Sequence, residues 1–136
     1  MTFTESIATC FSKFVVFSGR ARRSEFWWFA LFLAVVDIAL SFVSDALSSL
    51  WNLATLLPYA AVAWRRLHDI DRTGLWTLVP LIPAIIMLIG MVTDNPFGPV
   101  FWIGAVGFAA LSILNIVFWA SKGNVGPNQY GEDPVT

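Results

Sequence analysis

Long apolar segments separated by short polar stretches dominate the hydrophobic pattern. A helix that crosses the roughly 30 Å hydrocarbon core of a bilayer needs about 20 residues. Four charge-poor runs approach that length, at residues 26–45, 48–64, 75–92 and 100–120. Residues 26–64 as one helix would be about 58 Å long. The polar cluster at 44–49 therefore predicts a tight helical hairpin between the first two spans.

The third run contains Pro80 and Pro83, which free backbone carbonyls and predict a bend that neighbouring helices must satisfy. The stretch "TDNPFGP", residues 93–99, predicts a short turn before the fourth run.

The N-terminal segment 4–17 predicts a further helix of another kind. Ile7, Phe11, Phe14 and Val15 share one helical face, and Thr2 or Thr4 can act as the N-cap. This segment is too short and too polar to span a bilayer, so it should lie in the interface. The predicted fold is an all-α membrane protein: four transmembrane helices and an N-terminal interfacial amphipathic helix in a single domain, 1–136.

Composition supports this class. Hydrophobic residues make up 57% and charged residues 12% of the chain, whereas soluble domains contain roughly 25% charged residues. Cys10 is the one cysteine, so no intrachain disulfide can form. The net charge of −1 offers no basic field for nucleic acid, and we expect no nucleic-acid partner.

The basic residues predict an orientation. All 8 lysines and arginines fall before the first span, between the second and third, or after the fourth. The positive-inside rule places these segments in the cytoplasm, together with both termini and the tail 121–136. Asp45 and Asp94 then mark the opposite side. We expect no cleavable signal peptide, because the basic residues follow the first apolar stretch.

Three polar motifs lie on this predicted cytoplasmic side: "GRARRSEFWWF", "WRRLHDIDRTGLW" and "GNVGPNQYGEDP". Together they resemble a bacterial inner-membrane family, domain of unknown function 805. The resemblance implies a small multi-pass inner-membrane protein and brings no established activity. Two positions depart from the family pattern, with Leu75 in place of an aromatic residue and Gln129 in place of an arginine. The residues that carry the resemblance are Gly19, Arg20, Arg23, Glu25, Phe26, Trp27, Arg65, Arg66, Leu67, His68, Asp69, Gly74, Trp76, Gly126, Asn128, Tyr130, Gly131, Asp133 and Pro134.

The first two motifs form a candidate cluster that mixes acids with arginines. Arginines and aromatic residues at a helix entrance can simply anchor a span. Glu25 is not needed for anchoring and indicates ion pairs: Arg65 or Arg66 with Glu25, and Asp69 or Asp71 with Arg20 or Arg23. A binding site for anionic headgroups is the alternative. The cluster consists of Arg20, Arg22, Arg23, Glu25, Arg65, Arg66, His68, Asp69, Asp71 and Arg72.

Catalysis and metal binding have weak support in the sequence. His68, Asp69 and Asp71 lack a recognisable zinc spacing, and no nucleophile motif accompanies the histidine. We therefore predict no catalytic residue, no metal and no cofactor.

Asp37 is the unusual residue of the first span. Counted from Phe26 it falls about 16 Å along the helix, near the bilayer centre, where a carboxylate is costly. Ser41 continues a polar stripe that Asn52, Thr55 or Asn115 could meet. Asp37 is then a protonated hydrogen-bond donor between helices, part of an ion-linked site, or a residue that lies nearer water than this count places it.

These patterns predict a non-catalytic binding or structural protein of the inner membrane with a polar cap on its cytoplasmic face. Its expected partners are the bilayer and anionic headgroups, and a homo-oligomer is left open. Two alternatives remain: an oligomeric small transporter or channel around Asp37, and a lipid-acting enzyme that uses His68.

Overall fold

The computed structural model describes residues 1–93 and 96–135. Positions 94 and 95 of the predicted turn, including Asp94, and residue 136 of the tail lie outside the described residues. The described elements are the α-helices α1 (Phe3–Ser12), α2 (Arg23–Ser41), α3 (Asp45–Asp69), α4 (Leu81–Thr93) and α5 (Pro99–Ala120), and the 3₁₀ helix η1 (Gly74–Thr77).

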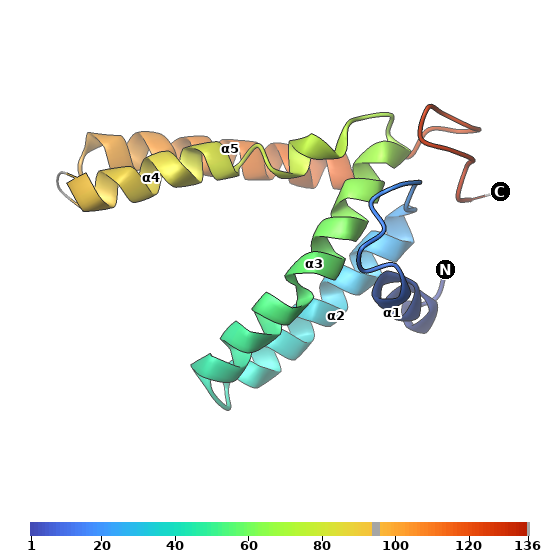
Figure 1. The fold of residues 1–136 in the computed structure, drawn as a ribbon, viewed down its shortest axis with the longest axis horizontal. Helices are drawn as coiled ribbons and strands as arrows, with labels where there is room; N and C mark the ends of the chain where they lie inside the picture. Colours follow the sequence, from blue (N-terminus) through green and yellow to red (C-terminus); the bar gives the residue numbers. More distant parts are fainter. Residues whose placement is uncertain (94–95, 136) are drawn as a thin grey trace.

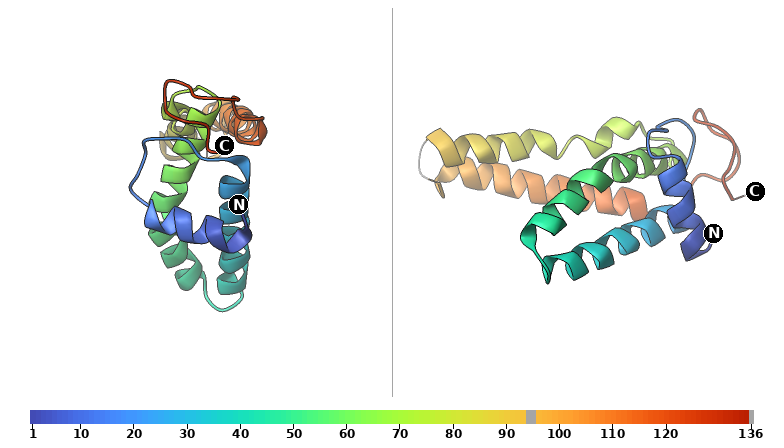
Figure 2. Two further views of the ribbon diagram at one scale, coloured as in Figure 1. Left: turned by 90° about the vertical axis from the view of Figure 1, so that its right-hand side faces the viewer. Right: turned by 60° about the horizontal axis from the view of Figure 1, so that its bottom comes forward.

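Two helical hairpins make up the body of the molecule. Helix α2 packs along α3, and α4 packs along α5, whereas α2 and α3 touch α5 over a short stretch. The two hairpins meet near the ends of the chain and diverge from there (Figure 1). Both termini lie at this shared end, and α1 crosses beside α2 and α3 (Figure 2). We call it the basic end, because Arg20, Arg66 and Lys122 lie there.

Four of the described helical segments are long and apolar enough to cross a membrane: α2, α3, η1 with α4, and α5. The predicted fold class is confirmed, but the second span is longer than predicted. Helix α3 continues to Asp69, five residues past the expected end at 64. Charges suggested that the span ends there, whereas Arg65 and Arg66 are buried and the helix continues through them.

The N-terminal helix begins as predicted and ends early. Thr2 forms a capping box with Glu5, since each side chain accepts a hydrogen bond from the other residue's backbone N–H. The helix stops at Ser12 instead of residue 17, so Phe14 and Val15 lie in the following loop and are exposed. An earlier end lets the chain turn back into α2, which packs against α1.

The hairpin between α2 and α3 turns over Phe42–Ser44. Ser44 caps α3 by accepting a hydrogen bond from the backbone N–H of Ala46. The break therefore comes earlier than predicted: it overlaps the polar cluster 44–49 only at Ser44, and the rest of that cluster lies within α3.

The third span is interrupted instead of bent. Its first turn is η1, and regular α-helix resumes only at Leu81. Pro80 has no N–H to continue a helical ladder, whereas Pro83 is tolerated because the first turn of a helix leaves its N–H groups unbonded.

Buried apolar residues gather near the basic end, where α1, α2 and α3 meet. Cys10, Phe26, Phe29 and Val62 are fully or almost fully buried there. Elsewhere most large apolar side chains are exposed, as expected for helices that face lipid.

Candidate functional site

Asp69 is the centre of a buried ion network at the basic end. Its Oδ1 accepts a hydrogen bond from Nε of Arg20 at 3.0 Å, and its Oδ2 accepts one from Nη1 of Arg66. The side chains of Arg20 and Asp69 are 1% and 4% exposed. Both carboxylate oxygens of Asp69 are therefore bonded to arginines away from water.

Arg20 also binds the C-terminal tail, residues 121–135. Its Nη1 donates to the carbonyl of Gly126 at 2.6 Å, and its Nη2 donates to the carbonyl of Asn124 at 2.5 Å. A planar guanidinium can serve all of these acceptors at once, whereas a lysine ammonium has three donors in a different geometry. Arg20 thus joins the entrance of α2, the end of α3 and the tail.

Arg66 makes the matching connection to α5. Its Nε donates to the carbonyl of Trp119 at 2.9 Å, and its Nη2 donates to the carbonyl of Ser121. These carbonyls belong to the end of α5, where the last turn has no intrahelical donors. Arg66 therefore supplies donors to α5 while it neutralises Asp69, three residues later on α3.

A second buried pair lies beside the first. Nη1 of Arg65 donates to Oε1 of Glu25 at 2.6 Å and ties α3 to the first turn of α2. The Sγ of Cys10 lies 4.0 Å from the same oxygen. Burial, and then the charge of Glu25, raise the pKa of the Cys10 thiol to about 12. Arg65 Nε and Nη2 are buried without a hydrogen-bond partner among the described residues.

Gly123 permits the tail to approach Asp69. A Cβ at this position would lie 2.1 Å from Oδ2 of Asp69, so any side chain there would displace the carboxylate. The backbone N–H of Asn124 donates to the carbonyl of Asp69 at 2.8 Å. The tail is thus bonded to the end of α3 through its backbone.

His68 and Tyr130 hold the outer part of the tail. Their rings are stacked with centroids 3.8 Å apart and an angle of 2° between planes. His68 Nδ1 lies 2.9 Å from the carbonyl of Gly19, and Asn128 Nδ2 donates to the carbonyl of His68 at 2.8 Å. The single histidine is thus a contact between loops and tail.

Two expected ion pairs, Arg65 with Glu25 and Arg20 with Asp69, are present in the structure. Asp71 is exposed in the left-handed region at φ 58°. Arg72 lies over the ring of Phe118, 4.4 Å from its centroid. Arg22 donates to the carbonyl of Pro134, and the side chain of Arg23 makes no hydrogen bond or ion pair to any described residue.

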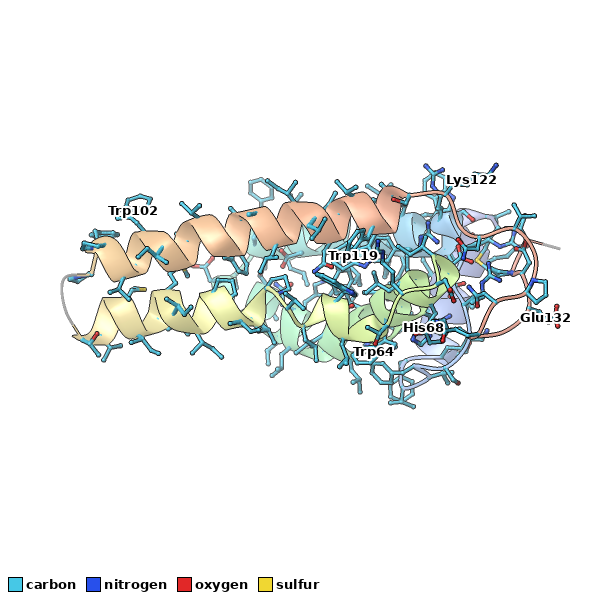
Figure 3. The ribbon with its side chains drawn as sticks, turned by 90° about the horizontal axis from the view of Figure 1, so that it is seen from above. Trp64, His68, Trp102, Trp119, Lys122 and Glu132 are labelled. Carbon is cyan, nitrogen blue, oxygen red and sulfur yellow. The ribbon has the colours of Figure 1, made fainter. Side chains whose placement is uncertain are left out.

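A cavity of about 590 Å³ lies next to the network, between the start of α2 and the tail. Its lining includes Arg22, Arg23, Lys122 and Asp133. Hydrogen bonds from the backbone N–H groups of Val135 and Gly126 lower the pKa of Asp133. Lys122, His68 and Glu132 lie at the same end of the molecule, far from Trp102 at the opposite end (Figure 3).

The predicted intramembrane polar residues divide between the two hairpins. Oδ1 of Asp37 accepts hydrogen bonds from Ser48 at 2.6 Å and Asn52 at 2.8 Å. Asp37 lies four residues before the end of α2 at Ser41, about 6 Å by helical rise. Asp37 therefore lies about one turn from the hairpin loop, nearer the end of α2 than its middle.

Ser41 and Asn115 do not meet Asp37. Ser41 donates to the carbonyl of Ile38 within its own helix. Asn115 lies in α5 and donates to the carbonyl of Trp76 at 2.9 Å. The polar stripe of the first hairpin is thus completed by Ser48 and Asn52 on α3.

Sequence reasoning missed the tail as a structural partner of the cluster. The backbone carbonyls of Asn124 and Gly126 accept hydrogen bonds from Arg20. Because every residue has a backbone carbonyl, the residue types do not show which ones act as acceptors. Gly123 was a weak signal, because a glycine lets another part of the chain approach the backbone closely, but the sequence does not show that Asp69 is its neighbour. Among the described residues, no group of three or more His, Cys, Asp or Glu side chains is arranged to hold a metal ion.

Comparison with known proteins gives consistent matches. Residues 14–132 match the family model described as protein of unknown function (DUF805). The inner membrane protein YhaI of Escherichia coli (strain K12) is 36% identical over 129 residues, covering 90% of this chain and 88% of that protein. The inner membrane protein YhaH of the same strain is 35% identical over 106 residues, covering 64% of this chain and 88% of that protein.

A third relative, the uncharacterized protein YiiR of Escherichia coli (strain K12), is 35% identical over 127 residues, covering 86% of this chain and 84% of that protein. No solved structure gives a significant match.

Proposed function

The chain belongs to the DUF805 family and is a multi-pass inner-membrane protein, and we propose from this premise that it acts as a non-catalytic binding and structural protein. In this proposal the basic end faces the cytoplasm and contacts anionic lipid headgroups. The network around Asp69 holds the two hairpins together beneath that surface and takes no part in chemistry.

The observation that carries the proposal is the division of the basic residues into two sets. Every guanidinium nitrogen of Arg20 and Arg66 is bonded to Asp69 or to a backbone carbonyl. Arg23 and Lys122 are exposed and make no hydrogen bond or ion pair to the described residues. Arg20 and Arg66 therefore bind other parts of the protein, whereas Arg23 and Lys122 are available to an anionic partner.

Exposed apolar side chains accompany these cations. Trp27 and Trp28, in the first turns of α2, are each 41% exposed. Phe14 and Val15 are exposed in the loop after α1. Aromatic residues beside basic residues favour the headgroup level of a bilayer, which supports contact of this end with lipid.

The bonds of His68 and Asp69 favour a structural role over catalysis. His68 has one ring nitrogen beside a backbone carbonyl and one face covered by Tyr130. Asp69 is saturated by two arginines. A general base must have a free nitrogen or oxygen within reach of a substrate proton, and both oxygens of Asp69 are already bonded to arginines.

Lipid preference tests the proposal. The purified protein is placed in nanodiscs of phosphatidylcholine alone or mixed with phosphatidylglycerol, and its melting temperature and co-purified lipids are measured at low and high salt. We expect a higher melting temperature with phosphatidylglycerol, enrichment of this lipid around the protein, and loss of the difference at high salt, because salt screens exposed charges. Equal behaviour in both lipids would contradict the proposal.

The orientation is tested by labelling single cysteines in a Cys10→Ala background. Val125→Cys, in the tail, and Thr93→Cys, at the end of α4, are both exposed positions. An impermeant thiol reagent applied to spheroplasts should label the second and spare the first. Labelling of both from outside would exclude a cytoplasmic basic end.

A further inference from the structure

The cavity beside the Asp69 network has the character of an anion site. We propose that it binds one phosphate group, supplied by the phosphodiester of an acidic phospholipid or by free phosphate. If a lipid supplies the phosphate, the inference rests on the proposed function and places the contact with the anionic headgroup in this cavity. The volume of about 590 Å³ lies within the usual range of small-molecule sites, roughly 300–1,000 Å³.

Positive charge predominates along the lining of this cavity. Arg22, Arg23 and Lys122 come from two segments 100 positions apart in the chain, and all three line the cavity. The side chains of Arg23 and Lys122 have no hydrogen-bond or ion-pair partner among the described residues. Their donors can therefore turn to a ligand without breaking a bond within the protein.

The two carboxylates of the lining do not cancel this charge. Asp69 is neutralised by Arg20 and Arg66, neither of which lines the cavity. Asp133 accepts hydrogen bonds from the backbone N–H groups of Gly126 and Val135. With Asp69 balanced in this way, three cations and the carboxylate of Asp133 remain along the lining, and a phosphate can take up the excess positive charge.

The start of α2 adds backbone donors to the side-chain cations. Arg22 is the N-cap and makes no side-chain capping bond, and Arg23 and Ser24 open the helix along the cavity wall. The first N–H groups of a helix lack intrahelical acceptors and favour a negative group.

The position of the cavity suits a lipid phosphate. It lies where α2 begins at Arg23 and just past the end of α5 at Ala120. Both helices are apolar enough to span a membrane, so this level corresponds to the headgroup region. Val125 and Val135 also line the cavity and are 84% and 70% exposed, which gives the uncharged part of a lipid headgroup an apolar contact.

The experiment uses the full-length protein in detergent after removal of bound lipid. Phosphatidylglycerol or phosphatidylcholine is titrated in, and native mass spectrometry counts the lipids bound. The cavity variant combines Arg23→Gln with Lys122→Gln. The matched controls are Lys13→Gln and Arg72→Gln, which likewise remove one lysine and one arginine charge from the basic end, but outside the cavity. Melting temperatures confirm that the variants fold, as expected for exposed side chains.

We expect wild type and the controls to bind one phosphatidylglycerol tightly, and the cavity variant to bind it about tenfold or more weakly. Inorganic phosphate is then added as a competitor. Displacement of the lipid in wild type assigns the site to the phosphate group itself. If the lipid binds and phosphate does not displace it, the site is specific for the lipid phosphodiester. If phosphate binds and the lipid does not, the natural ligand of the site is a soluble phosphate.

Two results overturn the inference: no binding of either ligand, or equal loss of affinity in the cavity variant and the controls. The latter result, with phosphatidylglycerol still preferred over phosphatidylcholine, would leave the proposed function intact. The protein could instead show no lipid preference but bind phosphate through Arg23 and Lys122. That result would overturn the proposed function and would still support the cavity site.

Discussion

Nε of Arg20 donates to Oδ1 of Asp69 over 3.0 Å, although 49 positions separate the two residues in the chain. Arg20 precedes the first hairpin and Asp69 closes it. Through Arg66 the same carboxylate is joined to the end of α5, which belongs to the second hairpin. Helix α3 also packs against η1, and α2 and α3 touch α5 over a short stretch. We infer that the network acts together with these contacts to fix how the hairpins meet.

The second hairpin depends on close approach of α4 and α5. A Cβ on Gly104 would lie 2.5 Å from the backbone N of Met87. We expect Gly104→Ala to lower the free energy of unfolding by about 1–3 kcal/mol, the usual cost of overpacking, measured by thermal unfolding in detergent. Gly107→Ala is the control, because its Cβ would meet only the Pro83 side chain at 3.1 Å. Equal effects would contradict the close packing of α5 on α4 at Gly104.

Cys10 should be unreactive in the folded protein. It is fully buried, and its pKa is raised from 9.0 to about 12. The neutral thiol therefore contributes stability below pH 9 that is lost as the pH rises toward 12. At pH 8 we expect maleimide to label Cys10 only after unfolding, whereas Ser12→Cys in a Cys10→Ala background should label at once. Fast labelling of native Cys10 would refute this burial.

The sequence predicted the four spans because hydrophobic length and charge placement are strong signals in a membrane protein. It misjudged the end of α3, since Arg65 and Arg66 resemble a span boundary until their buried partners are known. It also placed Asp37 near the middle of the first span, whereas α2 begins at Arg23 and ends at Ser41, so Asp37 lies nearer the end of the helix.

The ion pairs of the site were partly predictable. Acids and arginines in two motifs on one side of the membrane indicated pairing, and Glu25 with Arg65 was one of the stated pairs. The carbonyls of Asn124 and Ser121 could not be predicted as acceptors, because every residue has a carbonyl and only the fold brings these two to the arginines.

The tail should be held by ring stacking at Tyr130. Its ring lies on His68, and no hydrogen bond of its hydroxyl to a described residue is present. We expect Tyr130→Phe to leave protection of residues 124–135 in hydrogen exchange nearly unchanged and Tyr130→Ala to reduce it by about fivefold or more, since aromatic pairs contribute roughly 0.5–1.5 kcal/mol. Equal exchange in both variants would show that the stacking does not hold the tail.

Asp37 should behave as a local contact within the first hairpin. Oδ1 accepts from Ser48 and Asn52, and an asparagine oxygen can accept in the same way. We expect Asp37→Asn to change the free energy of unfolding by about 0.5 kcal/mol or less, and Asp37→Leu to lower it by about 1–3 kcal/mol, because two donors lose their acceptor. Equal stability of wild type and the leucine variant would exclude a structural role for Asp37.

A double-mutant cycle on Arg20 and Asp69 tests the central claim most directly. The free energy of unfolding in detergent is measured for wild type, Arg20→Gln, Asp69→Asn and the double variant, with Arg23 and Asp71 as a pair that makes no contact. We predict losses of about 3–5 kcal/mol when either charge loses its buried partner, and a coupling above about 1 kcal/mol for Arg20 with Asp69 only. Coupling below about 0.5 kcal/mol, the scatter of independent sites, would contradict the claim that Arg20 and Asp69 act as one buried network where the hairpins meet.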